Sequence, residues 1–510
     1  MSRLLAIVFL VFSCVALVGA TPPDPIEGKW LGQAGTPLDT IELGFEFKRN
    51  EKGELKAFLY EPVGNFYALE LPGVVDRKGE TYTISSYDTT LTLHGDALEG
   101  TYLPSKVPAT LRRTETLPSE TPVPELPPGP GPKWRAKLGA GEIFAPAAAR
   151  DGIAYVGSTN GTFNAIRESD GGFVWIFAAG RPIFGEALAT DANLFFVCDN
   201  GYLFKLDRKT GKEVWRYDLG DSRSPRILSH QIIDTVEPRI GEFDFENSSP
   251  LPRLADGVLF VGSGDGSFHA VDAETGKRVW RFEAPENGKP PEVTPWNPNG
   301  SNKIRTDALI DGPRVVFGSF GHKLRALDRK TGAEIWQKDL RAEISSSPVL
   351  VDGKIIVGSR GGVLYAFDRE TGKKLWGMLL WGSAIESTAV PGKGSLFYIG
   401  ASDLRRVSLI DAKDSRVLWR TDVFGLPWPR PAFSGGRVFA SATGYAPYQM
   451  RHLGSFNALD AETGKIIWRW PAPVTDSLVS GFAAPPVVDG DLVIVGGLDG
   501  TLYGFPATGN

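Results

Sequence analysis

A unit of about 40 residues is repeated seven times between Ile153 and Trp468. Each copy holds an apolar run, a glycine-rich turn, a second apolar run, an aspartate, another glycine turn and a tryptophan. The clearest copy runs from Gly257 to Trp280. Short strands repeated at this spacing are typical of the blades of a β-propeller. The repeat therefore predicts an all-β chain built around a propeller.

The two ends of the repeat region are expected to build one blade together. An eighth copy, from Leu492 to Phe505, ends before any tryptophan, and Trp134 stands one repeat length ahead of Trp175. We therefore predict that Trp134 lies on the outer strand of the last blade, which closes a ring of eight blades and leaves no long open edge. The tryptophans expected to dock each blade on its neighbour are Trp134, Trp175, Trp215, Trp280, Trp336, Trp376, Trp419 and Trp468.

The repeated polar residues are interpreted as structural. An aspartate such as Asp207 can accept backbone N–H groups two or three residues further on. The glycine that follows, such as Gly211, allows a positive φ. The tryptophan brings roughly 150–250 Å² of surface to bury against the next blade.

This Ala/Leu-x-Asp-x-x-Thr-Gly-x-x-x-Trp unit resembles the tryptophan-docking motif of the pyrroloquinoline-quinone (PQQ) repeat family over about residues 133–510. Two copies depart from it, because Ser415 replaces the turn glycine and Asp170 shifts the acidic position. One branch of the family resembles quinoprotein alcohol dehydrogenases, which hold PQQ and Ca²⁺ above the central channel and carry a disulfide between adjacent cysteines. This chain has no adjacent cysteine pair.

The other branch resembles the BamB-like propeller of the bacterial outer-membrane β-barrel assembly machinery, which has eight blades and no cofactor. The resemblance implies an exported, non-catalytic protein-binding scaffold at the cell envelope, with a protein or peptide partner and no cofactor. The alternative that it leaves open is a PQQ- and Ca²⁺-dependent dehydrogenase acting on alcohols or sugars. We expect a monomer.

The N-terminus predicts export. Residues 1–20 combine Arg3, a nearly apolar run and a small-residue end, as in a signal peptide cleaved before Thr21. A lipid on Cys14 is the alternative. No later segment has the ~20 apolar residues of a membrane-spanning helix, so a periplasmic or extracellular location is expected. Cys198 would then be the only cysteine, and we expect it to be buried and without a disulfide.

Three further segments follow the predicted signal peptide. Residues 21–116 alternate in short strands and predict a small antiparallel β-barrel, and the tripeptide from Gly28 to Trp30 resembles the opening of lipocalin-like domains. This module serves either as a ligand pocket or as a side-chain-filled spacer. Residues 117–132 are a proline-rich linker, and residues 133–510 form the propeller. The net charge of −5 and the lack of a long basic run argue against a nucleic-acid partner.

One rim of the propeller is the candidate functional face. The longest insertions, at residues 216–255, 281–307 and 442–454, are expected to lie there. Alignment of the innermost strands places Arg305, Glu386 and Arg430 near the channel mouth, where they either bind an anionic or peptide ligand or form an internal salt-bridge network. Aligned positions in other blades are Phe144, Phe184, Ser346 and Ala483.

Aromatic residues on the same rim suggest a contact surface for a protein. They are Trp296, Trp428, Tyr445 and Tyr448. The alternative is that they pack the insertions. The acidic run from Glu242 to Glu246 is interpreted as a solvated strand face, with Ca²⁺ binding as the alternative.

Overall fold

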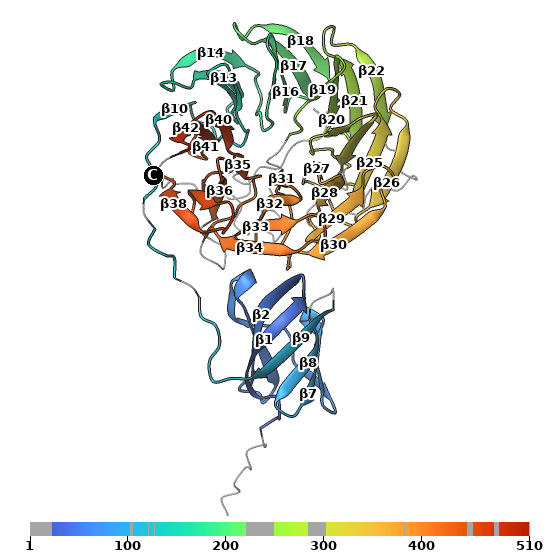
Figure 1. Ribbon diagram of the computed structural model, residues 1–510, viewed down its shortest axis with the longest axis vertical. Coiled ribbons are helices and arrows are strands. Elements are labelled where there is room, and N and C mark those ends of the chain that lie inside the picture. The colour runs from blue at the N-terminus through green and yellow to red at the C-terminus, as the bar shows by residue number, and fades with distance from the viewer. Residues whose placement is uncertain are drawn as a thin grey trace, which may run out of the picture. The chain divides into compact units, whose positions relative to one another are not determined.

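The computed structural model describes residues 23–102, 106–120, 122–126, 128–220, 249–283, 302–381, 383–445, 452–473 and 479–508. The chain forms two compact units, one built mainly from residues up to Ser119 and the other mainly from Glu120 onward (Figure 1). The predicted signal peptide, Cys14, Trp296, Tyr448 and the run from Glu242 to Glu246 lie outside the described residues. No helix in the described ranges is long and apolar enough to cross a membrane.

The N-terminal unit is one antiparallel sheet in the order β4-β3-β2-β1-β9-β8-β7-β6-β5. Its strands are β1 (Gly28–Thr36), β2 (Asp39–Arg49), β3 (Leu55–Glu61), β4 (Phe66–Glu70), β5 (Asp76–Lys78), β6 (Thr81–Ile84), β7 (Thr89–His94), β8 (Ala97–Tyr102) and β9 (Val107–Arg113), with short 3₁₀ turns at Pro62–Gly64 and Ser85–Tyr87. Among these strands the edge strands β4 and β5 do not pair with each other, so the predicted antiparallel module is confirmed as a half-barrel.

Alternation of apolar residues gives this sheet a filled inner face. Burial alternates at every second residue along β3, and Trp30, Phe45, Tyr82 and Tyr102 are among the largest fully buried side chains. The indole Nε1 of Trp30 donates to the carbonyl oxygen of Ile26 at 2.7 Å. These contacts favour a packed interior, while the likeness to lipocalins stays a prediction.

The second unit is the predicted propeller of eight blades, arranged in a ring in Figure 1. The strands, innermost first, are β11 (Ala148–Arg150), β12 (Ile153–Gly157), β13 (Thr162–Arg167) and β14 (Phe173–Ala178) in blade 1; β15 (Leu188–Ala189), β16 (Asn193–Cys198), β17 (Tyr202–Asp207) and β18 (Glu213–Asp218) in blade 2; β19 (Arg253–Ala255), β20 (Val258–Gly262), β21 (Ser267–Asp272) and β22 (Arg278–Glu283) in blade 3; and β23 (Leu309–Asp311), β24 (Arg314–Gly318), β25 (Lys323–Asp328) and β26 (Glu334–Asp339) in blade 4.

The remaining blades follow the same order. They are β27 (Val349–Val351), β28 (Lys354–Gly358), β29 (Val363–Asp368) and β30 (Lys374–Leu379) in blade 5; β31 (Val390–Pro391), β32 (Leu396–Ala401), β33 (Arg406–Asp411) and β34 (Val417–Asp422) in blade 6; β35 (Ala432–Ser434), β36 (Arg437–Tyr445), β37 (Ser455–Asp460) and β38 (Ile466–Pro471) in blade 7; and β40 (Val487–Asp489), β41 (Leu492–Gly496), β42 (Thr501–Pro506) and β10 (Trp134–Lys137) in blade 8. A further strand, β39 (Val479–Gly481), pairs with β36.

Closure of the ring by the N-terminal strand is confirmed. Strand β10 pairs antiparallel with β42, with Trp134 opposite Gly504. The N–H of Ile143, in the segment that enters blade 1, donates to the carbonyl oxygen of Gly497 in blade 8 at 3.2 Å. Both hydrogen bonding and packing therefore cross the seam between the two ends of the repeat region.

Six of the eight docking tryptophans lie over the turn glycine of the next blade. In blade 2 the Asp207 carboxylate accepts bonds from the N–H and the hydroxyl of Thr210 at 2.8 and 2.7 Å, and the hydroxyl bond lowers the pKa of Asp207. Gly211 then takes a φ of +69°, and a Cβ on it would lie 2.5 Å from Cε3 of Trp175. Glycine is required here by both conformation and space. The same aspartate–threonine pairing recurs at Asp272, Asp328, Asp368 and Asp460.

In two blades the turn position that faces the tryptophan is not filled by a glycine of the repeat. In blade 6 the turn residue is Ser415, which takes a φ of +67°. Blade 8 has no such turn, and Gly129 of the linker takes its place: a Cβ on Gly129 would lie 2.6 Å from Cε3 of Trp468. The N–H of Gly129 also donates to the carbonyl oxygen of Arg469 at 3.0 Å. The linker thus completes the ring of tryptophan contacts.

Candidate functional site

The mouth of the central channel is a pocket of about 100 Å³. All eight blades contribute residues to it, because the segment before each innermost strand returns from the outer strand of the preceding blade to the channel. An isoleucine anchors most of these segments: Ile183, for example, packs so closely on Gly157 of the preceding blade that a Cβ there would lie 2.3 Å from its Cγ2. Residues that follow the isoleucine are therefore held at the mouth.

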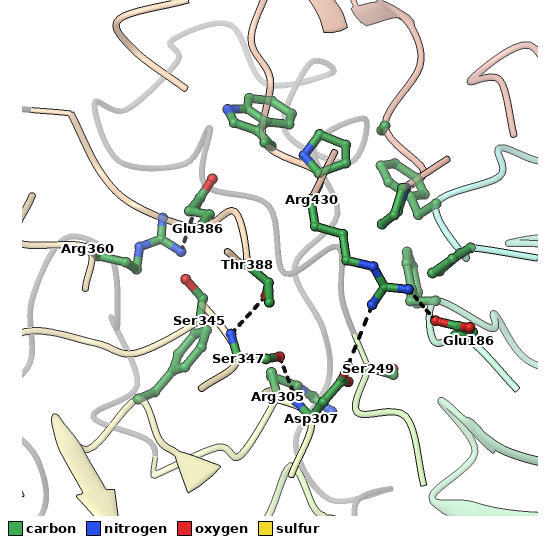
Figure 2. A pocket seen from close by; sticks show the side chains of 18 residues that line it. Glu186, Ser249, Arg305, Asp307, Ser345, Ser347, Arg360, Glu386, Thr388 and Arg430 are labelled. Atoms are coloured by element: carbon green, nitrogen blue, oxygen red, sulfur yellow. Dashed lines mark hydrogen bonds and ion pairs between the residues drawn. The ribbon is translucent and has the colours of Figure 1, made fainter. Parts of the chain in front are cut away.

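The predicted rim residues Arg305, Glu386, Trp428 and Arg430 all line this pocket. Figure 2 labels Arg305, Glu386 and Arg430 and draws the ion pairs of Glu386 and Arg430. Tyr445 lies at the end of β36, where its backbone is opposite Val479. Its side chain, like Trp296 and Tyr448, lies outside what is described. The sequence alignment thus brought together four residues that the fold places in one cavity.

Arg430 binds carboxylates from two other blades. Its guanidinium lies 2.5 Å from the Glu186 carboxylate and 3.8 Å from that of Asp307. Burial alone would lower the pKa of Arg430, but these two carboxylates outweigh it and the pKa is raised. Asp307 also accepts the N–H of Leu251 at 2.8 Å and lies 3.3 Å from the guanidinium of Arg253. The cluster fixes blades 2, 3, 4 and 7 around the opening.

A second ion pair lies between blades 5 and 6. The guanidinium of Arg360, from the turn between β28 and β29, lies 3.1 Å from the Glu386 carboxylate (Figure 2). Burial lowers the pKa of Arg360. Burial also raises the pKa of nearby Asp403, to about 6. The Asp403 carboxylate accepts the N–H of Ala384 at 3.1 Å. Arg305, only 3% exposed, lies at the same pocket.

The other side of the mouth is apolar. Phe144 and Phe184 lie with ring centroids 5.5 Å apart, and they form one buried cluster with Leu426 and Ala483, against which Trp428 packs. The mouth therefore combines an apolar wall with buried charge pairs. Sequence reasoning missed several polar residues there, among them Glu186, Asp307, Ser345, Ser347, Arg360 and Thr388.

Hydrogen bonds join neighbouring innermost segments at the mouth. The N–H of Asp307 donates to the hydroxyl of Ser347 at 2.9 Å, and the N–H of Ser347 donates to the hydroxyl of Thr388 at 2.9 Å. In the described parts of the chain, no group of three or more His, Cys, Asp or Glu side chains has the arrangement of a metal site.

Comparisons with known proteins agree with this architecture. A family model described as "Outer membrane protein assembly factor BamB" matches residues 131–242, 292–384 and 377–510. A second model, described as "Glucose/ethanol/alcohol dehydrogenase, beta-propeller domain", matches residues 233–337.

Individual relatives are distant. Outer membrane protein assembly factor BamB of Burkholderia pseudomallei is 24% identical over 358 residues, which cover 64% of this chain and 84% of that protein. The BamB of Salmonella typhimurium is 31% identical over 51% of this chain and 66% of that protein. Quinoprotein alcohol dehydrogenase PedH of Pseudomonas putida is 32% identical over 20% of this chain and 17% of that protein.

Known structures show the same fold. The computationally designed Ika8 protein covers 74% of this chain and 99% of its own, with a TM-score of 0.54 and 15% identity. Quinohemoprotein alcohol dehydrogenase ADHIIG from Pseudomonas putida covers 74% of this chain and 76% of its own, with a TM-score of 0.55 and 16% identity. These likenesses concern architecture alone. Since its repeats match the first family model over more than half of its length, the chain belongs to the propeller family described as outer membrane protein assembly factor BamB.

Proposed function

We propose that this protein is an exported, non-catalytic scaffold of the cell envelope that holds a protein or peptide partner at its channel mouth. The observation that carries the proposal is the composition of the mouth. Phe144, Phe184 and Trp428 form an apolar wall next to the ion pairs of Arg430 and Arg360. Aromatic and arginine side chains grouped in this way are typical of the contacts that dominate protein–protein binding.

The ion pairs of the mouth support binding by a preformed surface. Arg430 is held by Glu186 and Asp307, and Arg360 by Glu386, so these long side chains lose little further rotamer entropy when a partner binds. The family to which the chain belongs is described by outer membrane protein assembly, and this is the class of process in which such a partner is expected. The partner is proposed to be a protein of that assembly process.

The test is cross-linking and capture from bacterial envelope fractions with the purified protein and three variants. Trp428→Ala and Arg430→Met remove the aromatic and the cationic group from the mouth. The control, Arg281→Met, removes an arginine from outer strand β22, where it pairs with Asp265 and Glu283. We expect the two mouth variants to lose the captured protein and the control to keep it.

Thermal unfolding of each variant separates lost folding from lost contact. A folded Trp428→Ala protein that captures the same partner as the parent protein would contradict binding at the mouth. The same result with Arg430→Met would exclude a role for the arginine cluster.

A quinoprotein dehydrogenase is the second candidate, favoured by the match of residues 233–337 to a dehydrogenase propeller model. The described residues of the mouth do not fit PQQ with Ca²⁺. Calcium takes about six to eight oxygen ligands, whereas Glu186, Asp307 and Glu386 are each bound to an arginine. The pocket of about 100 Å³ is also below the roughly 300–1,000 Å³ typical of cofactor sites.

Incubation with PQQ and Ca²⁺ followed by desalting tests this second candidate directly. Retention of quinone absorbance in proportion to protein, together with alcohol-dependent dye reduction, would replace the scaffold proposal with an enzymatic one. We expect neither signal.

A further inference from the structure

The outer strand of blade 1 differs from the other seven in charge. In most blades the residue after the docking tryptophan is polar. Five of the eight such residues are arginines: Arg135, Arg216, Arg281, Arg420 and Arg469. Two others are Gln337 and Gly377, and in blade 1 the residue is Ile176. Among the eight described outer strands, β14 alone contains no charged residue.

The apolar side chains of β14 are exposed. The strand reads Phe-Val-Trp-Ile-Phe-Ala, and Phe173, Val174 and Ile176 are 42, 45 and 57% exposed. Trp175 and Phe177 alternate with them and pack into the core between blades 1 and 2. Proteins normally protect edge strands with charges, proline or bulges. The register of β13 with β14 shifts between Ala165 and Ile166, as the matching pair does in blade 2, but this edge lacks the charge that its counterparts carry.

The backbone of β14 is also open on one side. In the described part of the chain β14 is the last strand of its sheet and pairs only with β13, with Phe163 opposite Phe177 and Ala165 opposite Trp175. Alternate N–H and C=O groups of such a strand point outward, where they can form hydrogen bonds with another extended chain. The edge therefore offers both backbone hydrogen bonds and apolar contacts.

The protein itself shows that an outer edge of this propeller accepts an extended segment. The linker lies beside β38, the outer strand of blade 7, where Pro128 forms a parallel bridge with Arg469. The N–H of Gly129 donates to the carbonyl oxygen of Arg469 at 3.0 Å. Strand β14 is likewise the outermost strand of its blade, and it pairs with no such segment among the described residues.

We propose that β14 is a docking edge that binds an extended segment of another protein by strand addition, with apolar side chains at alternate positions of that segment. Backbone hydrogen bonds would supply affinity and the alternating apolar contacts would supply selectivity. The surface is separate from the channel mouth, because β14 is the fourth strand outward from the centre. The inference does not rest on the proposed function.

The size of the edge favours a single segment over a second copy of the chain. A strand of six residues is about 20 Å long. Pairing along that length alone buries far less than the ~1,200 Å² of a stable protein–protein interface. One flexible strand can be bound reversibly by such a short edge, whereas two whole propellers would need additional contacts.

The repeat itself supplies the test variant. Ile176→Arg places in blade 1 the residue that five other blades already have, so it should fold. The matched control is Val214→Arg, which adds the same charge at a residue that is 52% exposed on β18, a strand that already carries Glu213, Arg216 and Asp218. The probe is a fluorescent peptide of about ten residues in which valine alternates with threonine. A second probe has the same sequence with alternate backbone nitrogens methylated.

Fluorescence anisotropy should show saturable binding of the first peptide to the wild-type protein and the Val214→Arg variant. We expect binding to weaken at least about tenfold in Ile176→Arg and to be absent for the methylated peptide. Hydrogen exchange should show new protection of β14 amides when the peptide is bound. The proposal is overturned if wild type does not bind the peptide, if Ile176→Arg binds it equally well, or if sedimentation shows that Ile176 mediates self-association instead.

Discussion

Replacing Gly129 with alanine should destabilise the propeller, because this linker glycine lies against Trp468. The new Cβ would be 2.6 Å from Cε3 of the indole, about 1 Å closer than the ~3.5–4.0 Å at which carbon atoms attract. Trp468 is 2% exposed and packs against Phe439, Phe456 and Phe505, so the ring cannot move away freely. Overpacking of this kind costs about 1–3 kcal/mol.

The matched control is two residues away in the same linker. A Cβ on Gly131 would meet nothing within 4 Å. Gly131→Ala should therefore be neutral, or stabilising by about 0.4–1 kcal/mol through the lower entropy of the unfolded chain. Both variants make the same chemical change, and only one makes it next to the tryptophan.

Urea unfolding followed by tryptophan fluorescence measures the difference. If a unit of roughly 380 residues unfolds cooperatively, its unfolding entropy is about 0.8 kcal/mol/K, so Gly129→Ala should also lower the thermal midpoint by about 1–4 °C. In a Trp468→Ala background the penalty of Gly129→Ala should disappear, as a double-mutant cycle requires for residues in contact. Equal unfolding midpoints for the two glycine variants would refute the view that the linker completes the ring of tryptophan contacts.

Three further predictions concern single groups. Ser415→Gly should raise the free energy of unfolding by up to about 1 kcal/mol, because Ser415 holds a φ of +67° that only glycine adopts without strain; a lower urea midpoint would contradict this. Burial raises the pKa of Glu61 in the half-barrel to about 7 from 4.5. The protonated carboxyl therefore contributes about 3 kcal/mol to the free energy of unfolding. This contribution is complete below pH 4.5 and is lost as the pH rises through 7. Glu61→Gln should remove this decline, and thermal midpoints at pH 5 and pH 8 will show whether it does. Burial raises the pKa of the Cys198 thiol to about 11, so iodoacetamide at pH 8 should modify it only after unfolding; peptide mapping that finds the native thiol modified would show that the site is open.

The eight-bladed ring was predictable because the same sequence motif recurs in nearly every blade. Seven copies of the motif end in a tryptophan, and an eighth copy without one required a strand from elsewhere. Trp134 lies 41 residues before Trp175, close to the 40 residues between Trp175 and Trp215. The contact between Gly129 and Trp468 was not predictable in the same way. Gly129 lies in a proline-rich segment without the aspartate and threonine that mark the other turns, so only its position in space identifies it.

The channel mouth was predictable in part, since alignment used one position in each blade. Side chains two residues apart in an extended segment point to the same side, so the residues that follow Arg305 and Trp428 by two, Asp307 and Arg430, share the mouth with them. Applied to Phe184, that rule would also have found Glu186. In blade 5 the alignment was shifted by one residue: it selected Ser346, whereas its neighbours Ser345 and Ser347 line the pocket. Arg360 comes from a different turn, which no alignment of the innermost segments includes.

The pairing of β10 with β42 sets the order in which this protein can mature. Strand β10 is synthesised first among the propeller strands, and its partner β42 is the last of them to be made. Until β42 is made, β10 has no strand to pair with and blade 8 is incomplete. The exposed strand edges of the nascent chain can then pair with other unfolded chains and aggregate. Loss of only the final strand should therefore be as damaging as loss of a whole interior blade, because either change leaves the circle incomplete.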